Sequence, residues 1–454
     1  MSFTKRQLTP GNQTTMKNKH RNHQLSAMEC PVNRNDVDLF SPGAQEHWYE
    51  AYPILHETEP VVRVPGEGTS SATDGFILTK YEDIALVVKD PVRFPPRIHQ
   101  AIDLLKQTDS NDDTYRQANA MLLSMVSLRP DNALYRAHRQ ELTDPWVGPG
   151  ASRHTEMIKD CIRRLLDAWD HHSEVEFISQ FARPLPQMVM ANVLGFPESD
   201  IPQLAEWGAA QVTAFVYGKG HRNILSARQA EKQLKLLDGF KEYVHEKVLE
   251  KRREPEDDMI SWLTQAHYKA LDRKLTDIEV NGIVYAMVIG GLETTQYAIE
   301  EQAQLLCEHP GLFNTLKLDR NLVKNFVEEG MRLRSPTQGL STRVTRQDEE
   351  FQGVKVPKGS LLHLRYGAAN VDPAEWTDPY ELNLNRKAVT RHLVFSAGPR
   401  VCPGAGISRL EQNLAWQALL DCLEHINYAK DNTFEHQPGI MLGTLSLKLN
   451  IKWA

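Results

Sequence analysis

The strongest restriction on the fold comes from a long, largely apolar segment without proline between Thr276 and Glu308. It opens with the capping-box sequence Thr-Asp-Ile-Glu and stops before Pro310. We expect one helix of about 32 residues, ~48 Å long. At its centre, Gly290 and Gly291 weaken the helix and are followed by an acid and an alcohol. Taken alone, a Gly-Gly pair more often marks close helix packing than a functional site.

Length and composition set the outer limits. A chain of 454 residues is about three times a typical domain of ~150, so it forms either several domains or one large fold. With 41% hydrophobic and 24% charged residues it is globular, not disordered or fibrous. The net charge of −7 and the absence of a long Lys/Arg run argue against nucleic acid as a partner.

Two further counts bear on location. The longest strongly apolar stretch, 282–292, is about half of the ~20 residues needed to cross a bilayer, so we expect no membrane anchor. The five cysteines are odd in number and include no Cys-x-x-Cys pair, which favours a reducing compartment over a disulfide framework. The expected location is cytoplasmic.

The pattern along the chain predicts a mainly α protein with a small β lobe. Residues 1–35 are polar and are expected to form a flexible arm, followed by one domain over 36–454. Short alternating runs up to about Pro95 predict a small sheet, and long helical periods follow from Arg136, such as 156–169 and 228–252.

The C-terminal part adds more strands. The segment 351–360 predicts a strand, a turn and a second strand, and 441–453 alternates like a final hairpin.

One cysteine stands in a Gly/Pro-rich loop directly before a helical run that we expect to reach about Leu419. Residues 395–406 read Phe-Ser-Ala-Gly-Pro-Arg-Val-Cys-Pro-Gly-Ala-Gly, with Cys402 as the cysteine. A helix N-terminus and free backbone N–H groups favour thiolate over thiol, as a metal ligand or a nucleophile requires. A cysteine considered alone is more often buried and inert, so the spacing around it decides the interpretation.

That spacing, Phe-x-x-Gly-x-Arg-x-Cys-x-Gly, resembles the haem-binding signature of the cytochrome P450 monooxygenases. The matching residues are Phe395, Gly398, Arg400, Cys402 and Gly404. The resemblance implies that the Cys402 thiolate binds the iron of haem b, that Phe395 packs beside it and that Arg400 meets a haem propionate. Ser396 stands where glycine is usual and Arg400 where histidine is usual; an arginine can still pair with a carboxylate.

The centre of the long apolar segment is similar to the distal helix of the same family, whose motif is Ala/Gly-Gly-x-Asp/Glu-Thr. Residues 290–294 read Gly-Gly-Leu-Glu-Thr and place Gly291 at the haem. Activation of bound O₂ consumes protons, which an alcohol and a solvent-linked carboxylate can supply. The resemblance therefore implies Thr294 beside O₂ and Glu293 in the proton relay, with room for O₂ and water where the glycines distort the helix.

Two more segments carry the resemblance. Glu329 and Arg332 lie at i, i+3 on one helix face, and the family's Glu-x-x-Arg motif implies a buried pair joined by a later arginine, Arg386. The alternative is a surface ion pair worth ~0.5 kcal/mol or less.

Residues 131–139 are similar to the family's helix over the haem edge. Arg139 falls on a propionate-binding arginine, and Tyr135 replaces the usual histidine and can donate a hydrogen bond. Arg343 is placed like another propionate partner.

The resemblance implies a single large P450 fold with haem between a long distal helix and the proximal cysteine loop. The expected reaction uses O₂ and two NAD(P)H-derived electrons, delivered by ferredoxin reductase and ferredoxin. Arg136, Arg139 and Arg409 either steer this acidic partner or serve only haem and solvent.

The expected reaction is hydroxylation or oxidative dealkylation of a small to medium, mainly apolar organic substrate. Its pocket is expected to be lined from 97–126, 207–221, 285–294, 337–342 and 439–444. A peroxide-driven peroxygenase is an alternative that the Glu293-Thr294 pair argues against, because direct use of peroxide needs no proton relay. A non-catalytic haem sensor is a further alternative, for which no output domain is visible.

Overall fold

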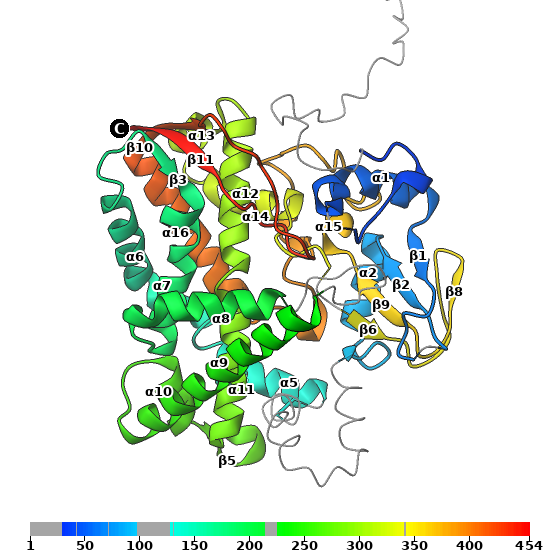
Figure 1. Cartoon of the computed structure of the whole chain (residues 1–454), viewed down its shortest axis with the longest axis horizontal. Helices are drawn as coiled ribbons and strands as arrows, with labels where there is room; N and C mark the ends of the chain where they lie inside the picture. Colours follow the sequence, from blue (N-terminus) through cyan, green and yellow to red (C-terminus); the bar gives the residue numbers. More distant parts are fainter. Residues whose placement is uncertain are drawn as a thin grey trace, which may run out of the picture.

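The computed structural model describes residues 30–41, 43–70, 72–97, 128–129, 131–213, 225–339 and 342–454. Figure 1 shows a helical part on one side and a smaller β lobe on the other. Most of the arm expected over 1–35 lies outside the described residues. Within 30–35, the 3₁₀ helix η1 (Arg34–Asp36) begins at a capping box on Asn33. The extent of the domain, 36–454, stays a prediction.

The helical part contains the elements that surround the site. They are α5 (Asn132–His138), α6 (Thr155–Asp167), α7 (Pro184–Leu194), α8 (Ile201–Thr213), α9 (Ala227–Arg253), α10 (Met259–Gln265), α11 (Asp277–Gly291), α12 (Thr294–Glu308), α13 (Leu312–Leu318), α14 (Leu322–Leu333) and α16 (Ala405–Cys422). Short π-helical turns, η3 (Arg139–Thr143) and η5 (Ile178–Ala182), extend α5 and precede α7. The helices predicted over 156–169, over 228–252 and after Cys402 are confirmed as α6, α9 and α16.

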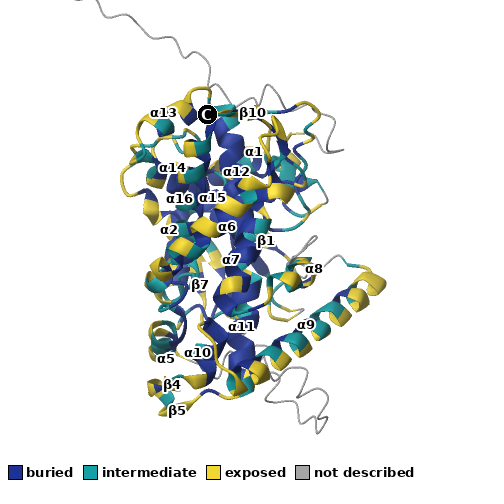
Figure 2. Cartoon of the chain, turned by 90° about the vertical axis from the view of Figure 1, so that its left-hand side faces the viewer, coloured by how far each residue is buried: buried dark blue, intermediate teal, exposed yellow. Residues whose placement is uncertain are grey.

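The single helix predicted from Thr276 to Glu308 is wrong at its centre, because the structure divides it into α11 and α12. The Thr294 hydroxyl donates to the Gly290 carbonyl at 2.8 Å. A threonine that bonds the carbonyl four residues back bends a helix, and two glycines make the bend easy. Glu293 becomes the N-cap of α12. Figure 2 shows α11 and α12 as mostly buried, in contrast to the exposed outer face of α9.

The β lobe is built on a four-stranded sheet of order β1-β2-β9-β6. Its strands are β1 (Val61–Val64), β2 (Gly75–Leu78), β6 (Thr342–Val344) and β9 (Leu361–Leu364), of which β2 and β9 run parallel. The helices α1 (Trp48–Thr58), α2 (Tyr81–Lys89) and α15 (Tyr366–Ala369) lie beside it (Figure 1). The predicted strand-turn-strand appears as the hairpin β7 (Glu349–Phe351) and β8 (Val354–Val356), which begins two residues earlier than expected.

A second sheet has the order β10-β11-β3, with β3 (Glu174–Glu176), β10 (Leu423–Tyr428) and β11 (Lys448–Trp453). The hairpin predicted for 441–453 is wrong, since only β11 is a strand there and both its partners lie earlier in the chain. The residues before β11 form isolated bridges instead, from Met441 to Thr337 and from Thr444 to His436. A two-stranded pair, β4 (His267–Tyr268) and β5 (Arg273–Lys274), lies after α10.

Across the described ranges, no helix has both the length and the apolar character needed to span a membrane.

Candidate active site

The cysteine loop is closed by its own backbone and by the β lobe. The Cys402 N–H donates to the Phe395 carbonyl at 2.8 Å, and a 3₁₀ turn at Gly398–Arg400 lies between them. Gly398 has φ +71°, and a Cβ there would lie 2.9 Å from both Lys89 Cα and the Val88 carbonyl oxygen. Only glycine fits this close approach to α2. The loop is therefore held rigidly before α16 begins.

Ser396 occupies the position where the family motif usually has glycine. Its φ is +60°, a left-handed conformation that costs a non-glycine residue about 1–2 kcal/mol. The Tyr366 hydroxyl lies 3.1 Å from Ser396 Oγ and hydrogen-bonds to it. This bond offsets part of the cost and explains how the loop keeps its shape without the glycine.

The Cys402 sulfur lies at the N-terminus of α16. Burial raises the pKa of its thiol, and the N–H groups of Gly404 and Ala405 and the charges of Arg139 and Arg409 oppose that rise. A Cβ at Gly404 would lie 3.9 Å from Sγ, so no side chain crowds the sulfur from this side. A cation bound at the sulfur would favour the thiolate over the thiol.

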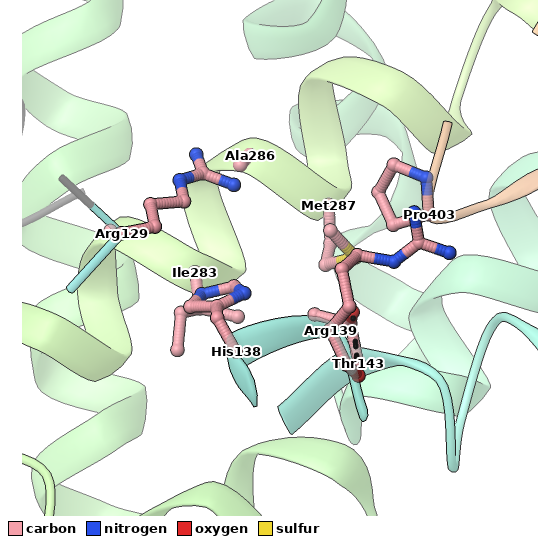
Figure 3. A pocket seen from close by; sticks show the side chains of 9 residues that line it. Arg129, His138, Arg139, Thr143, Ile283, Ala286, Met287 and Pro403 are labelled. Carbon is pink, nitrogen blue, oxygen red and sulfur yellow. Dashed lines mark hydrogen bonds between the residues drawn. The ribbon is translucent and has the colours of Figure 1, made fainter. Parts of the chain in front are cut away.

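A small pocket lies between α11, the segment Arg139–Thr143 and Pro403 of the cysteine loop. In Figure 3, the Arg139 side chain reaches up beside Pro403 and Met287, and Arg129 and His138 lie on the other side. The remaining lining residues are Arg129, His138, Thr143, Gly282 and Ile283.

The two glycines of α11 have different surroundings. Gly290 is exposed, and a Cβ there would meet no atom within 4 Å. Gly291, the glycine predicted to lie at the haem, packs against α7, where its Cβ would be 2.7 Å from Met190 Cγ. The glycine that borders open space is therefore Gly290, and Gly291 permits close contact between two helices.

Glu293 and Thr294 lie at the break between α11 and α12 and are both half-buried. Burial raises the pKa of Glu293, while a hydrogen bond from Tyr297 and the charge of Arg183 lower it. The Thr294 hydroxyl is bonded to the Gly290 carbonyl, as described above. The Glu293 carboxyl and the Thr294 hydroxyl are thus adjacent at the break between α11 and α12.

Three arginines near one another form what we call the open cluster: Arg129 and Arg400, which both contact Tyr135, and Arg343, whose charge acts on Arg400. The Arg400 and Arg129 guanidinium groups lie over the Tyr135 ring, 4.6 and 5.6 Å from its centroid. Burial lowers the pKa of Arg400, and the like charges of Arg129 and Arg343 lower it further. In the described part of the chain, the buried Nε atoms of Arg343 and Arg400 have no hydrogen-bond partner.

The other arginines of the predicted site already have partners. Arg139 pairs with Asp144 at 2.8 Å and donates to the Val401 carbonyl at 2.6 Å, which ties α5 to the residue before Cys402. Arg409 is bonded to Glu328 at 2.6 Å. These contacts favour structural roles over steering of a partner, whereas Arg136 is exposed.

The predicted Glu329–Arg332–Arg386 cluster is confirmed, and we call it the closed cluster. Glu329 accepts hydrogen bonds from Arg332 at 2.7 and 2.8 Å and from Arg386 at 2.8 and 3.1 Å. The side chains of Glu329 and Arg332 are 0% exposed. Arg332 also donates to the carbonyls of Asn370 and Pro379, so all its charge is satisfied inside the protein.

The residues present fit a haem. Gly404 leaves the Cys402 sulfur uncrowded, and Pro403, the next residue, lines a pocket under α11. Among the described residues, the buried Nε atoms of Arg343 and Arg400 are donors without a partner, and two propionates would supply the acceptors. Phe395 is the first residue of the cysteine loop, and the Arg409 guanidinium lies 4.4 Å from the centroid of its ring.

The comparisons with known proteins agree with this fit. The sequence model of the family described as Cytochrome P450 matches residues 221–451, just over half of the 454 residues. This chain belongs to the cytochrome P450 family. The protein is similar to the biotin biosynthesis cytochrome P450 of Bacillus subtilis, with 29% identity over 86% of this chain and 92% of that one. Cytochrome P450(MEG) of Priestia megaterium is 26% identical over 93% of this chain and 98% of its own length.

A solved structure gives the same result. P450BioI in complex with an acyl carrier protein ligated to hexadec-9Z-enoic acid superimposes with a TM-score of 0.75 and 26% identity, covering 90% of this chain and 99% of that one. The protein is therefore a P450 monooxygenase with the P450 fold.

Several residues of this P450 site carried no clear signal in the sequence. Arg129 precedes α5 without a motif, and Tyr297 reads as an ordinary apolar position of a long helix. Gly443 lies in a segment expected to be a hairpin. Tyr297 and Gly443 are placed by their contact with each other, which joins distant parts of the chain.

Parts of the expected substrate pocket can be located. Of the five segments, 285–294 and 439–444 are fully described, whereas nearly all of 97–126 lies outside the described residues. Gln338 is buried and bonded to the hydroxyls of Tyr49 and Tyr52. Its side-chain amide therefore forms hydrogen bonds within the protein interior.

Proposed function

We propose that this P450 binds haem b through Cys402 and hydroxylates or oxidatively dealkylates a small to medium, mainly apolar organic substrate. Electrons come from NAD(P)H through ferredoxin reductase and ferredoxin, in the cytoplasm. The observation that carries the proposal is the Cys402 loop at the start of α16, whose Pro403 lines a pocket under α11. The break between α11 and α12 carries Glu293 and Thr294.

The cofactor supplies O₂ binding and activation, which the electron-donating thiolate favours. Cys402 holds the iron, and the loop stays in place through Gly398, Gly404 and the Phe395 carbonyl. Arg343 and Arg400 of the open cluster bind the propionates, with Tyr135 beside them and Arg139 bracing the loop.

Thr294 and Glu293 handle protons. The Thr294 hydroxyl, anchored on the Gly290 carbonyl, is positioned to hold water at the open side of the helix. Glu293 has a raised pKa, so it takes up and releases a proton closer to neutral pH than an exposed glutamate does. Together they would hold and pass protons between solvent and the Thr294 hydroxyl.

The relatives support a mainly apolar substrate. One relative is named a biotin biosynthesis cytochrome P450, a second is named a polyketide biosynthesis cytochrome P450, and the solved P450BioI is in complex with an acyl carrier protein ligated to a fatty acid. Buried apolar residues of the expected pocket, Val288, Met441 and Leu442, suit such a chain.

The test is a reduced-plus-CO spectrum followed by titration of the ferric protein with fatty acids, terpenoids, steroids, aromatic compounds and methyl ethers. We expect the thiolate-type CO spectrum, and its loss in Cys402→Ser but not in the buried-cysteine control Cys161→Ser. A normal spectrum in Cys402→Ser would overturn the assignment of the ligand.

Turnover decides between electron donors. We expect product with NAD(P)H, ferredoxin reductase and ferredoxin to form faster than with peroxide alone. Equal or faster turnover with peroxide would identify a peroxygenase instead. No turnover with either donor, despite a substrate-induced spin shift, would favour a sensor.

A further inference from the structure

The carboxylate of Glu293 is held by a tyrosine one turn later. The Tyr297 hydroxyl donates a hydrogen bond to Glu293 Oε2, and the Tyr297 N–H donates to the Glu293 carbonyl at 3.1 Å. Tyr297 is 3% exposed, and burial together with the carboxylates of Glu293 and Glu300 holds its pKa well above the usual 10. The hydroxyl therefore keeps its proton and acts as a donor to the carboxylate.

The C-terminal segment fixes the ring of Tyr297. A Cβ at Gly443 would lie 2.5 Å from ring atoms Cδ1 and Cε1. The segment is closed by a bond of 2.8 Å from the Gln437 N–H to the Gly443 carbonyl. It is anchored to α12 by the Thr444 N–H, which donates to Glu300 Oε1 at 2.6 Å. The ring cannot turn away unless this segment moves.

The two oxygens of Glu293 have different surroundings. Oε2 is engaged by Tyr297, whereas Oε1 faces α8, where a Cβ at Gly208 would stand 3.9 Å away. The charged group that acts on Glu293 from another element is Arg183, in the turn before α7. Oε1 is thus the oxygen that is not bound to the tyrosine.

We propose that Tyr297 is a positioning residue for the proton relay and that Gly443 of the C-terminal segment keeps it in place. Tyr297 retains its own proton and holds Oε2. Oε1 then receives a proton from solvent-linked water and releases that proton toward Thr294. The inference rests on the proposed role of Glu293, and its test separates the two.

The direct test is an infrared pH titration of the haem-loaded enzyme, with the Glu293 carboxyl band assigned by difference from Glu293→Gln. Tyr297→Phe removes a hydrogen bond that stabilises the carboxylate, so the pKa of Glu293 is expected to rise. The matched control is Tyr268→Phe, since Tyr268 is equally buried and donates to the Leu134 carbonyl at 3.3 Å. This control is expected to leave the band unchanged.

Gly443→Ala provides an independent variant, because the added methyl group must displace the Tyr297 ring. It should raise the pKa of Glu293 in the same direction. In both variants kcat should fall about tenfold with KM unchanged, short of the ~100-fold or more that loss of a general acid causes. Thermal melting and the CO spectrum verify folding.

The outcomes are distinct. An unchanged Glu293 pKa in folded Tyr297→Phe and Gly443→Ala overturns the inference and leaves the proposed function intact. Full turnover by Glu293→Gln overturns the relay itself.

Discussion

The closed and open clusters contain the same kind of side chain in opposite situations. In the closed cluster, Arg332 and Arg386 share the carboxylate of Glu329, and every group is paired inside the protein. In the open cluster, Arg343 is buried and Arg400 half-buried, and the buried Nε atoms of both lack a hydrogen-bond partner among the described residues. Buried cations are stable only when paired. The first cluster is complete by itself, whereas the second calls for an anion from outside the chain.

The largest effect is expected from opening the closed cluster. Glu329→Gln leaves two buried arginines without a counter-charge and should lower the free energy of unfolding by ~3–5 kcal/mol. Chemical denaturation of the purified protein measures this. Glu350→Gln, at an exposed glutamate, is the control and should change stability little. A loss below ~1 kcal/mol in Glu329→Gln would show that the cluster is not held by charge pairing.

Acid should weaken a further pair of internal ion pairs, those of Glu328 with His392 and Arg409, but not the open cluster. His392 and Arg409 pair with Glu328 and lower its pKa from 4.5 to about 2 despite burial. A carboxyl whose pKa is lower in the folded than in the unfolded protein stabilises the fold at any pH above its unfolded-state pKa. This contribution to the free energy of unfolding, ~3 kcal/mol at most, is lost as pH falls from about 5 toward 2. The unfolding free energy measured against pH should therefore fall less steeply in Glu328→Gln. An identical slope in wild type and variant would contradict this account.

The open cluster is expected to matter for the cofactor more than for the apoprotein. Arg343→Gln or Arg400→Gln removes a like charge from the cluster and should leave the stability of the apoprotein unchanged or slightly higher. Haem should leave each variant about tenfold faster, because a charge-assisted bond to a propionate is lost. Transfer of haem to apomyoglobin gives the rate, with Arg346→Gln at an exposed arginine as the control. If the apoprotein is instead destabilised as strongly as in Glu329→Gln, the two clusters do not differ.

The smallest effect is expected from the Tyr135 ring, which contacts Arg129 and Arg400 of the open cluster. Tyr135→Leu removes cation–π contacts with Arg129 and Arg400 and should destabilise the apoprotein by ~1 kcal/mol. Tyr135→Phe keeps the ring and should leave the unfolding midpoint in urea near wild type. Equal losses in both variants would assign the effect to the hydroxyl.

The sequence predicted the parts that depend on local pattern. The cysteine loop is one continuous motif, and the closed cluster follows from i, i+3 spacing plus one later arginine, so both could be named in advance. The helix break could not, because a glycine pair permits either close packing or a bend. The Thr294 bond to the Gly290 carbonyl decides for the bend.

What the sequence could not predict depends on contacts between distant segments. Residues 441–453 alternate like a hairpin, but alternation fixes which face is buried and not which strand is the partner. Gly291 and Gly290 are neighbours in the motif, and only the position of Met190 shows which one packs against a helix. Tyr297 acquires its contact with Gly443 from a segment almost 150 residues later.

The place of β11 has a consequence for the order in which the chain folds. Lys448–Trp453 lies between β10 and β3, and Leu449 pairs with Val175 across 449 − 175 = 274 residues. Translation adds roughly 5–20 residues per second, so β3 waits for more than ten seconds before its neighbour is made. During that time β3 presents an unpaired strand edge that other nascent chains can join. Yield during expression should therefore depend on chaperone supply and on growth temperature.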